Sequence, residues 1–246
     1  MASPAGGLRA PARGDMAAVE PGEVRWTRVR VVFGKRGRLR FLGQLDVGRT
    51  FDRSLRRTGL PVRFTEGFNP RVRVSFPCAC PTGMASSCEI AEVQVRPPAG
   101  ACAVAEALRD DLPAEFPILA AEEVPEGERL RLLEASYAVV PAAGTDLPTP
   151  GRLAGLAAAP SIPAVRRGKP VDLAPFLRGL DAGPGRLRVR IAFLANGATV
   201  RPEDFLRALG EDPGRYRAER IGVLVELRRA ETTGRGATTG ERRYGA

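Results

Sequence analysis

The feature that most constrains the fold of this chain is an alternation of apolar residues with arginine. Val29, Val31 and Phe33 alternate with arginines, and the pattern recurs over residues 71–76 and 186–193. Residues two apart on a β-strand point to the same face of the sheet. The alternation therefore predicts strands that each have one apolar and one cationic face.

Turn and helix signals between these strands predict a first β-α-β-β-α-β unit. Asp46 precedes apolar residues spaced four apart, so we expect it to be the N-cap of a helix that ends near Gly59. The expected elements are a strand over 28–33 continued by a hairpin or bulge to 38–41, a helix over 46–57, strands at 62–64, 71–76 and 89–96, a helix at 101–112 and a strand at 117–124.

A second, weaker β-α-β-β-α-β pattern follows. Thr149 and Pro150 are typical of the N-cap and first position of a helix. The stretch 161–181 is irregular, and Asn196-Gly197 predicts a turn. The expected regular elements are strands at 135–139, 187–193 and 221–227, and helices at 149–159 and 202–209.

The predicted fold class is α+β, with two tandem ferredoxin-like units that have antiparallel sheets. We expect a disordered tail at 1–22, a basic ferredoxin-like domain at 23–127 and a second ferredoxin-like domain at 128–228. Low apolar content predicts a second disordered tail at 229–246. Met16 is an alternative start to Met1.

The positive charge of the chain is concentrated in its first third. Residues 24–77 hold 14 basic and three acidic residues, a balance of +11, whereas the remainder holds 24 basic and 25 acidic residues. Such a field attracts polyanions. With only two lysines, codon bias explains the preference for arginine but not the local lack of acids. The arginines could also be ordinary solvated positions, or pair with acids of the second unit.

Several function classes are excluded or disfavoured. Histidine is absent, which excludes Ser-His triads, Cys-His pairs and His-ligated zinc. Cys78, Cys80 and Cys88 lack the spacing of a usual metal site, so we expect reduced thiols that pack as small apolar residues. We predict no metal and no cofactor. No apolar run approaches the roughly 20 residues that span a bilayer, and no signal peptide is recognisable, so we expect a cytoplasmic protein without membrane contact.

If the apolar strand faces contact the helices, the arginines must face outward and form a basic sheet surface. Phe41 and Phe64 then belong to the core, while Phe68 lies in a turn and can stack on an unpaired base. Arginine suits phosphate because its planar fork donates two parallel hydrogen bonds. The candidate RNA-binding residues are Arg28, Arg30, Lys35, Arg36, Arg38, Arg40, Arg49, Arg53, Arg63, Phe68, Arg71 and Arg73.

The runs RLRFLGQLD (38–46), FDRSLRRTGLP (51–61) and TEGFNP (65–70) resemble the radical SAM-linked protein family, a bacterial family with a domain of unknown function. The resemblance implies a radical SAM protein as partner. Where the family often has histidine, this chain has Gln44 and, after Pro70, arginine-valine-arginine, which favours binding over catalysis.

We therefore expect a non-catalytic RNA-binding accessory protein that works with a radical SAM enzyme in RNA modification or processing. One alternative is a protein-interaction subunit whose basic face docks on an acidic surface of the radical SAM partner. Another is a metal-independent endoribonuclease that uses Lys35, an arginine or one of the tyrosines.

Overall fold

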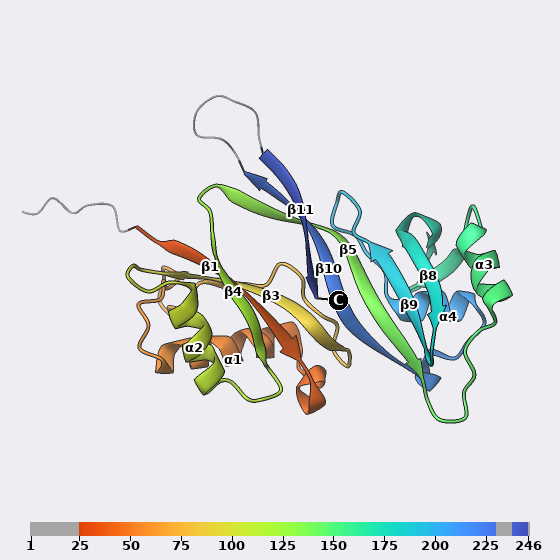
Figure 1. Cartoon of the computed structure of the whole chain (residues 1–246), viewed down its shortest axis with the longest axis horizontal. Helices are drawn as coiled ribbons and strands as arrows, with labels where there is room; N and C mark the ends of the chain where they lie inside the picture. Colours follow the sequence, from red (N-terminus) through yellow and green to blue (C-terminus); the bar gives the residue numbers. More distant parts are fainter. Residues whose placement is uncertain (1–24, 230–237, 246) are drawn as a thin grey trace, which may run out of the picture.

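The computed structural model describes residues 25–229 and 238–245, which form an α+β fold (Figure 1). Most strands belong to a nine-stranded mixed sheet, whose main path runs β4-β1-β3-β10-β5-β9-β8. Strand β2 pairs with β3, β11 pairs with β10, and β6 and β7 form a separate two-stranded sheet. The strands are β1 (Thr27–Lys35), β2 (Val74–Ser75), β3 (Ala85–Val95), β4 (Ile118–Val124), β5 (Glu128–Pro141), β6 (Pro163–Arg166), β7 (Lys169–Asp172), β8 (Leu177–Gly183), β9 (Arg186–Ala192), β10 (Tyr216–Arg229) and β11 (Thr238–Gly245).

In the first half of the molecule, two helices cover one face of β1, β3 and β4 (Figure 1). The apolar residues of the β1 alternation point to these helices, where the rings of Phe33 and Phe51 lie 4.7 Å apart. Burying each such ring contributes roughly 1.5–3 kcal/mol. The helices are α1 (Gln44–Arg57) and α2 (Ala101–Asp111), and a 3-10 helix, η1 (Gly37–Phe41), precedes α1.

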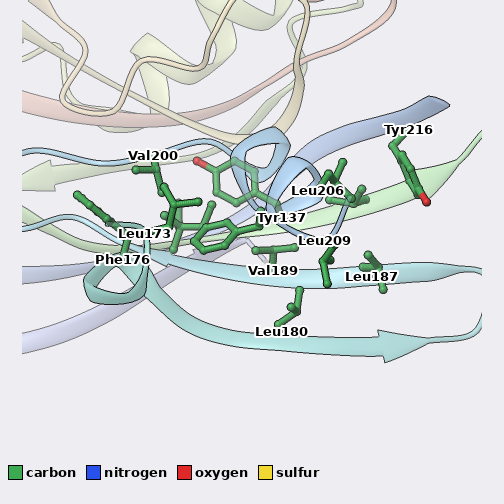
Figure 2. Close-up of a cluster of buried hydrophobic side chains, with 14 of the residues drawn as sticks. Tyr137, Leu173, Phe176, Leu180, Leu187, Val189, Val200, Leu206, Leu209 and Tyr216 are labelled. Carbon is green, nitrogen blue, oxygen red and sulfur yellow. The ribbon is translucent and has the colours of Figure 1, made fainter. Parts of the chain in front are cut away.

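The second half has a core of its own on one face of β5, β8 and β9. Tyr137, Leu173 and Val189 lie at its centre, and Leu206 of α4 packs beside them (Figure 2). Thr149 is the N-cap of α3 and Pro150 its first residue, as predicted. The helical segments are α3 (Pro150–Ala158), η2 (Ala174–Phe176), α4 (Pro202–Ala208) and η3 (Pro213–Arg215).

Strand β10 joins the two halves. It pairs in parallel with β3 at Glu219 and Arg220, and along most of its length it is antiparallel to β5. From Gly222 onward β10 pairs with β11 on its other side. Val223 and Val225 of β10 pack with Val32 and other apolar residues of the first half. The face of the first sheet opposite the helices is therefore partly covered by the second half.

The α+β class is confirmed, whereas the structure does not show two tandem ferredoxin-like units, because one sheet runs through both halves. The expectation of purely antiparallel sheets is wrong for the β3–β10 pair. Asp46 is not an N-cap: α1 begins after Gly43, and Asp46 lies in its first turn. The expected strand at 38–41 is instead η1, which begins at Gly37 in a left-handed conformation that ends the extended strand.

The predicted disordered tail at 229–246 is wrong over 238–245, which form strand β11. Low apolar content misled the prediction, because β11 is held by backbone pairing with β10 and by one buried aromatic, Tyr244. The predicted tail at 1–22 lies outside the described residues, and the domain boundaries remain predictions. In the part of the chain that the structure describes, no helix has the length and apolar character to cross a membrane.

Candidate nucleic-acid interface

Arg30, predicted to face a polyanion, is instead buried in a cluster of carboxylates. Its guanidinium lies 2.8 Å from Glu92, 3.3 Å from Glu122 and 3.0 Å from Glu128, and it donates to the Tyr244 hydroxyl at 3.1 Å. Burial alone would lower the pKa of Arg30, but Tyr244 and Glu92 raise it above its ordinary value. Arg30 is therefore a buried cation whose guanidinium N–H groups already donate hydrogen bonds inside the protein.

Arg28 and Lys35, from the same strand, are also partly or wholly withdrawn from solvent. Arg28 donates to the backbone carbonyl of Glu128 and lies 3.6 Å from Glu92. Lys35 is buried, and its ammonium group lies 3.3 Å from the Pro81 carbonyl and 3.4 Å from that of Cys80. The pleat does sort arginine from aliphatic residues, but acids of both halves surround Arg30 and backbone carbonyls of the first half surround Lys35, so the predicted basic sheet surface is wrong for these two residues.

A second buried charge pair lies where β3 and β10 meet. Arg220 is ion-paired with Glu89 and donates to the Cys78 sulfur at 2.8 Å. Burial raises the pKa of the Cys78 thiol to about 11, although Arg220 opposes the rise. Cys78, Cys80 and Cys88 are all buried in apolar clusters, so the predicted packing role is confirmed, and their pKa values disfavour thiolate chemistry.

The exposed part of the basic segment starts at η1. Gly37 allows the chain to turn sharply after β1, so Arg36 and Arg38 project into solvent. Phe41 was predicted to be in the core but is 58% exposed, with the Arg40 guanidinium 4.5 Å from its ring centroid. The prediction failed because residues 37–41 are not a strand, so their alternation does not sort side chains between two faces.

Helix α1 continues this surface. Arg49, Arg53 and Arg56 follow one another at spacings of four and three residues and are exposed on one helix face. Arg49 lies 3.2 Å from Asp46, and Arg56 lies 2.8 Å from Asp52. Within residues 25–229 and 238–245, no carboxylate lies within ion-pair distance of Arg53.

The loop that follows α1 is fastened to its last turns. Burial alone would raise the pKa of Asp52, but hydrogen bonds from Arg56 and from the Val72 amide, the latter at 2.7 Å, lower it below its ordinary value. Arg56 also lies 4.9 Å from the Phe64 ring, which is 40% exposed and not in the core as predicted. The charged form of Asp52 therefore holds the loop against the helix.

This loop presents exposed side chains at its tip. Phe68 is fully exposed, as its place in a turn predicted, and Arg71 and Arg73 are exposed near it in sequence. Among the described residues, neither arginine forms an ion pair. Arg63 differs from its neighbours, since it donates to Gln94 and contacts Trp26 away from this loop tip.

We call a set of basic and apolar residues on η1, on α1 and on this loop the α1 surface. All of them are exposed except the half-buried Arg40, and the acids Asp46 and Glu66 are exposed among them. The α1 surface brings together most of the predicted residues and adds apolar ones that were not predicted to be exposed. A helix of this length spans about 21 Å between the two ends of the surface. Its members are Arg36, Arg38, Arg40, Phe41, Leu45, Arg49, Arg53, Arg56, Phe64, Phe68, Arg71 and Arg73.

The composition of the α1 surface decides which ligands it can hold. Guanidinium groups bind phosphate, and exposed phenylalanines offer faces on which unpaired bases stack. The described part of the chain contains no cluster of three or more residues of the kinds that ligate metals.

Comparison with known proteins places these features in a family. The profile of a family described as "Uncharacterized protein conserved in bacteria (DUF2344)" matches residues 28–202. This match includes the α1 surface and extends into the second half of the molecule. No curated protein matches the sequence.

Proposed function

Since this chain belongs to the bacterial family of uncharacterized proteins DUF2344, we propose its function from its surface: it binds RNA through the α1 surface as a non-catalytic accessory protein. The observation that carries the proposal is the set of exposed arginines without carboxylate partners beside exposed phenylalanines. Arg36, Arg38, Arg53, Arg71 and Arg73 form no ion pair among the described residues, whereas Arg30 of β1 contacts three carboxylates.

The distinction between paired and unpaired arginines gives the proposal its physical content. An arginine that already contacts a carboxylate gains little from a phosphate, because it must give up one anion to bind another. An unpaired, exposed arginine instead releases condensed counterions from the nucleic acid when it binds, which favours association. The α1 surface therefore supplies the binding energy, while the charges of β1 stabilise the fold.

The exposed rings favour single-stranded over double-stranded RNA. Base stacking on an aromatic side chain contributes about 1–3 kcal/mol and requires an unpaired base. Phe68 at the loop tip and Phe41 at η1 are exposed at opposite ends of α1. Bases in loops or single strands can reach such rings, whereas bases in a duplex are stacked on one another.

Fluorescence anisotropy with a labelled single-stranded RNA tests the proposal. The full chain should bind, with an affinity that falls steeply as salt is raised. The triple variant Arg38→Gln, Arg53→Gln, Arg73→Gln should bind on the order of a hundredfold more weakly, since each of the three lost phosphate contacts is worth about 1 kcal/mol. The single variant Arg186→Gln is the matched control, because Arg186 is exposed on β9 in the second half.

The main alternative is that the α1 surface docks on an acidic protein. Exposed Phe41 and Leu45, 58% and 77% accessible, would suit a protein interface. Competition separates the two functions: a polyglutamate chain that displaces RNA poorly supports RNA binding. Tight binding to polyglutamate with no measurable RNA affinity would favour docking and reject RNA as the ligand.

The endoribonuclease alternative receives no support from the groups considered for it. Lys35 and all three tyrosines (Tyr137, Tyr216 and Tyr244) are buried, so none of them lies on the α1 surface. The arginines of the α1 surface do not exchange protons near neutral pH. Incubation with labelled RNA should leave the RNA intact, and cleavage that survives repurification would overturn this part of the proposal.

The resemblance to the radical SAM-linked family supports the rest of the proposal. We infer that a radical SAM enzyme is the partner, that the pair acts on RNA, and that it does so in the bacterial cytoplasm.

We also propose that the two halves are diverged copies of one β-α-β-β-α-β unit. The strand orders β4-β1-β3-β2 and β10-β5-β9-β8 support this, since each unit then has its last strand beside its first.

A further inference from the structure

An open cavity of about 1180 Å³ lies away from the loop tip and η1, at the start of β1 and the turn between β4 and β5. This volume exceeds that of a typical small-molecule site. The cavity is lined by four arginines, one tryptophan, one glutamine and three glutamates, among other residues. These are Arg25, Arg28, Arg63, Arg129, Trp26, Gln94, Glu123, Glu126 and Glu128.

The arginines and glutamates of the cavity differ in whether their charges already contact other groups of the fold. Glu128 is buried and pairs with Arg30 at 3.0 Å, so its charge is balanced inside the fold. Glu123 reaches toward Gly100, the N-cap of α2: its Oε1 lies 2.5 Å from where a Cβ on Gly100 would be. A carboxylate is favoured at that end of a helix.

The remaining charges leave the cavity cationic. Arg25, Arg63 and Arg129 have no ion-pair partner in the described ranges, and Arg28 shares Glu92 with Arg30. Glu126, in the exposed turn, and the exposed Glu123 form no ion pair in these ranges either, so three unpaired arginines face two unpaired glutamates. Three unpaired guanidinium groups therefore border one open space, which favours an anionic ligand with more than one negative charge.

Trp26 gives the cavity a second recognition element. It is the only tryptophan in the chain and is partly exposed. The Arg63 guanidinium lies 5.6 Å from its ring centroid and also donates to Gln94 at 3.0 Å. Arg63 is thus oriented before any ligand arrives, beside an aromatic surface on which a planar group can pack.

We propose that this cavity binds a nucleoside phosphate, with the base against Trp26 and the phosphates held by Arg25, Arg63 and Arg129. A planar ring next to a multiply charged anion is the ligand that fits both elements of the cavity. The cavity borders the base of the loop of the α1 surface, where the Arg73 amide donates to the Arg63 carbonyl at 2.7 Å, and it takes a free nucleotide rather than an RNA strand.

Intrinsic fluorescence tests this proposal directly, because the single tryptophan lies in the cavity. Adenosine 5′-diphosphate added to the full chain should change the Trp26 emission in a saturable way. Adenosine without phosphate should have a much weaker effect, and free N-acetyltryptophanamide measures collisional quenching. The exposed Arg129→Gln variant should weaken nucleotide binding about tenfold, and Arg63→Gln should do so as well. Arg186→Gln, at an exposed position of β9 outside both the cavity and the α1 surface, should leave the affinity unchanged.

Two results would overturn the inference. One is a linear, unsaturable response that matches N-acetyltryptophanamide, and the other is equal nucleotide affinity in the wild type and in Arg129→Gln. A response to single-stranded RNA without one to adenosine 5′-diphosphate would also reject it and would assign the cavity to the RNA surface. Saturable nucleotide binding in a protein that fails to bind RNA would leave this inference standing and reject only the proposed function.

Discussion

Arg30 in β1 and Arg53 in α1 come from the same basic segment, yet their surroundings are opposite. Arg30 is about 1% exposed and contacts Glu92, Glu122 and Glu128, whereas Arg53 is exposed and contacts only the Thr50 hydroxyl among the described groups. The second half of the molecule supplies Glu128 and Tyr244 to Arg30. An arginine of this segment is therefore structural where acids from distant parts of the chain contact it. It is available to a ligand where they do not.

The largest effect that separates the two regions should come from Arg30→Met. This variant leaves three carboxylates without their shared cation, so we expect the free energy of unfolding to fall by about 3–5 kcal/mol. Urea unfolding followed by circular dichroism measures the change. Arg53→Met, matched in chemistry but exposed, should stay within about 0.5 kcal/mol of the wild type. Equal stability of the two variants would remove the distinction between the regions.

Tyr244→Phe should have the next largest effect. The Tyr244 hydroxyl accepts from Arg30 and donates to Glu122 at 2.7 Å, and hydrogen bonds to charged groups contribute about 1.5–3 kcal/mol. Because Tyr244 lies in β11, the loss would show that the C-terminal strand belongs to the charge cluster. A double-mutant cycle with Glu122→Gln should give a coupling energy above about 0.5 kcal/mol, and strict additivity would refute the coupling.

Phe68→Ala tests the other region, and its effect should appear in binding alone. The side chain is fully exposed, so its removal should leave the unfolding midpoint unchanged. If Phe68 stacks on a base, affinity for single-stranded RNA should fall by about 1 kcal/mol, or about fivefold. Val165→Ala, at an exposed apolar residue of the second half, is the control and should bind RNA like the wild type.

The smallest effect concerns pH. Burial alone would raise the pKa of Glu122, but hydrogen bonds from Tyr244 and Arg242 lower it below its ordinary value of 4.5. A lowered carboxyl pKa contributes stability that is present above the ordinary value and is lost as pH falls through the lowered one. The urea concentration at the unfolding midpoint should therefore decrease as the pH is lowered below about 4.5. The decrease should be less steep in Glu122→Gln. Parallel pH profiles would contradict this role.

Local sequence patterns predicted much of the fold. The alternation around Val31 placed β1 and its apolar face correctly, and Thr149-Pro150 placed the start of α3, because these signals depend on neighbours in the chain. Pairing of the outward arginines with acids of the second unit was one of the open alternatives, and Arg30 does pair with Glu128, but the segments that cover this side of β1 could not be predicted. This side is covered by β10 and β11, whose position depends on the parallel pairing of β10 with β3 far away in the sequence.

The candidate site was predicted only where it is exposed independently of distant segments. Phe68 and Arg71 lie in a loop, and Arg53 lies on the solvent face of an amphipathic helix, so local rules sufficed. Phe41 was misassigned because period-2 alternation was extended past Gly37, where the chain leaves the strand. Gly37 was the signal that could have separated residues 38–41 from the strand, whereas Gly34 lies within β1.

The salt dependence of RNA binding tests the central claim most directly, namely that exposed, unpaired arginines of the α1 surface contact phosphate. For single strands, the slope of log affinity against log salt changes by about 0.7 for each phosphate contact. The triple variant Arg38→Gln, Arg53→Gln, Arg73→Gln should therefore have a slope shallower by about 2 than the wild type, while Arg186→Gln should match it. Identical slopes for the triple variant and the wild type would contradict the account.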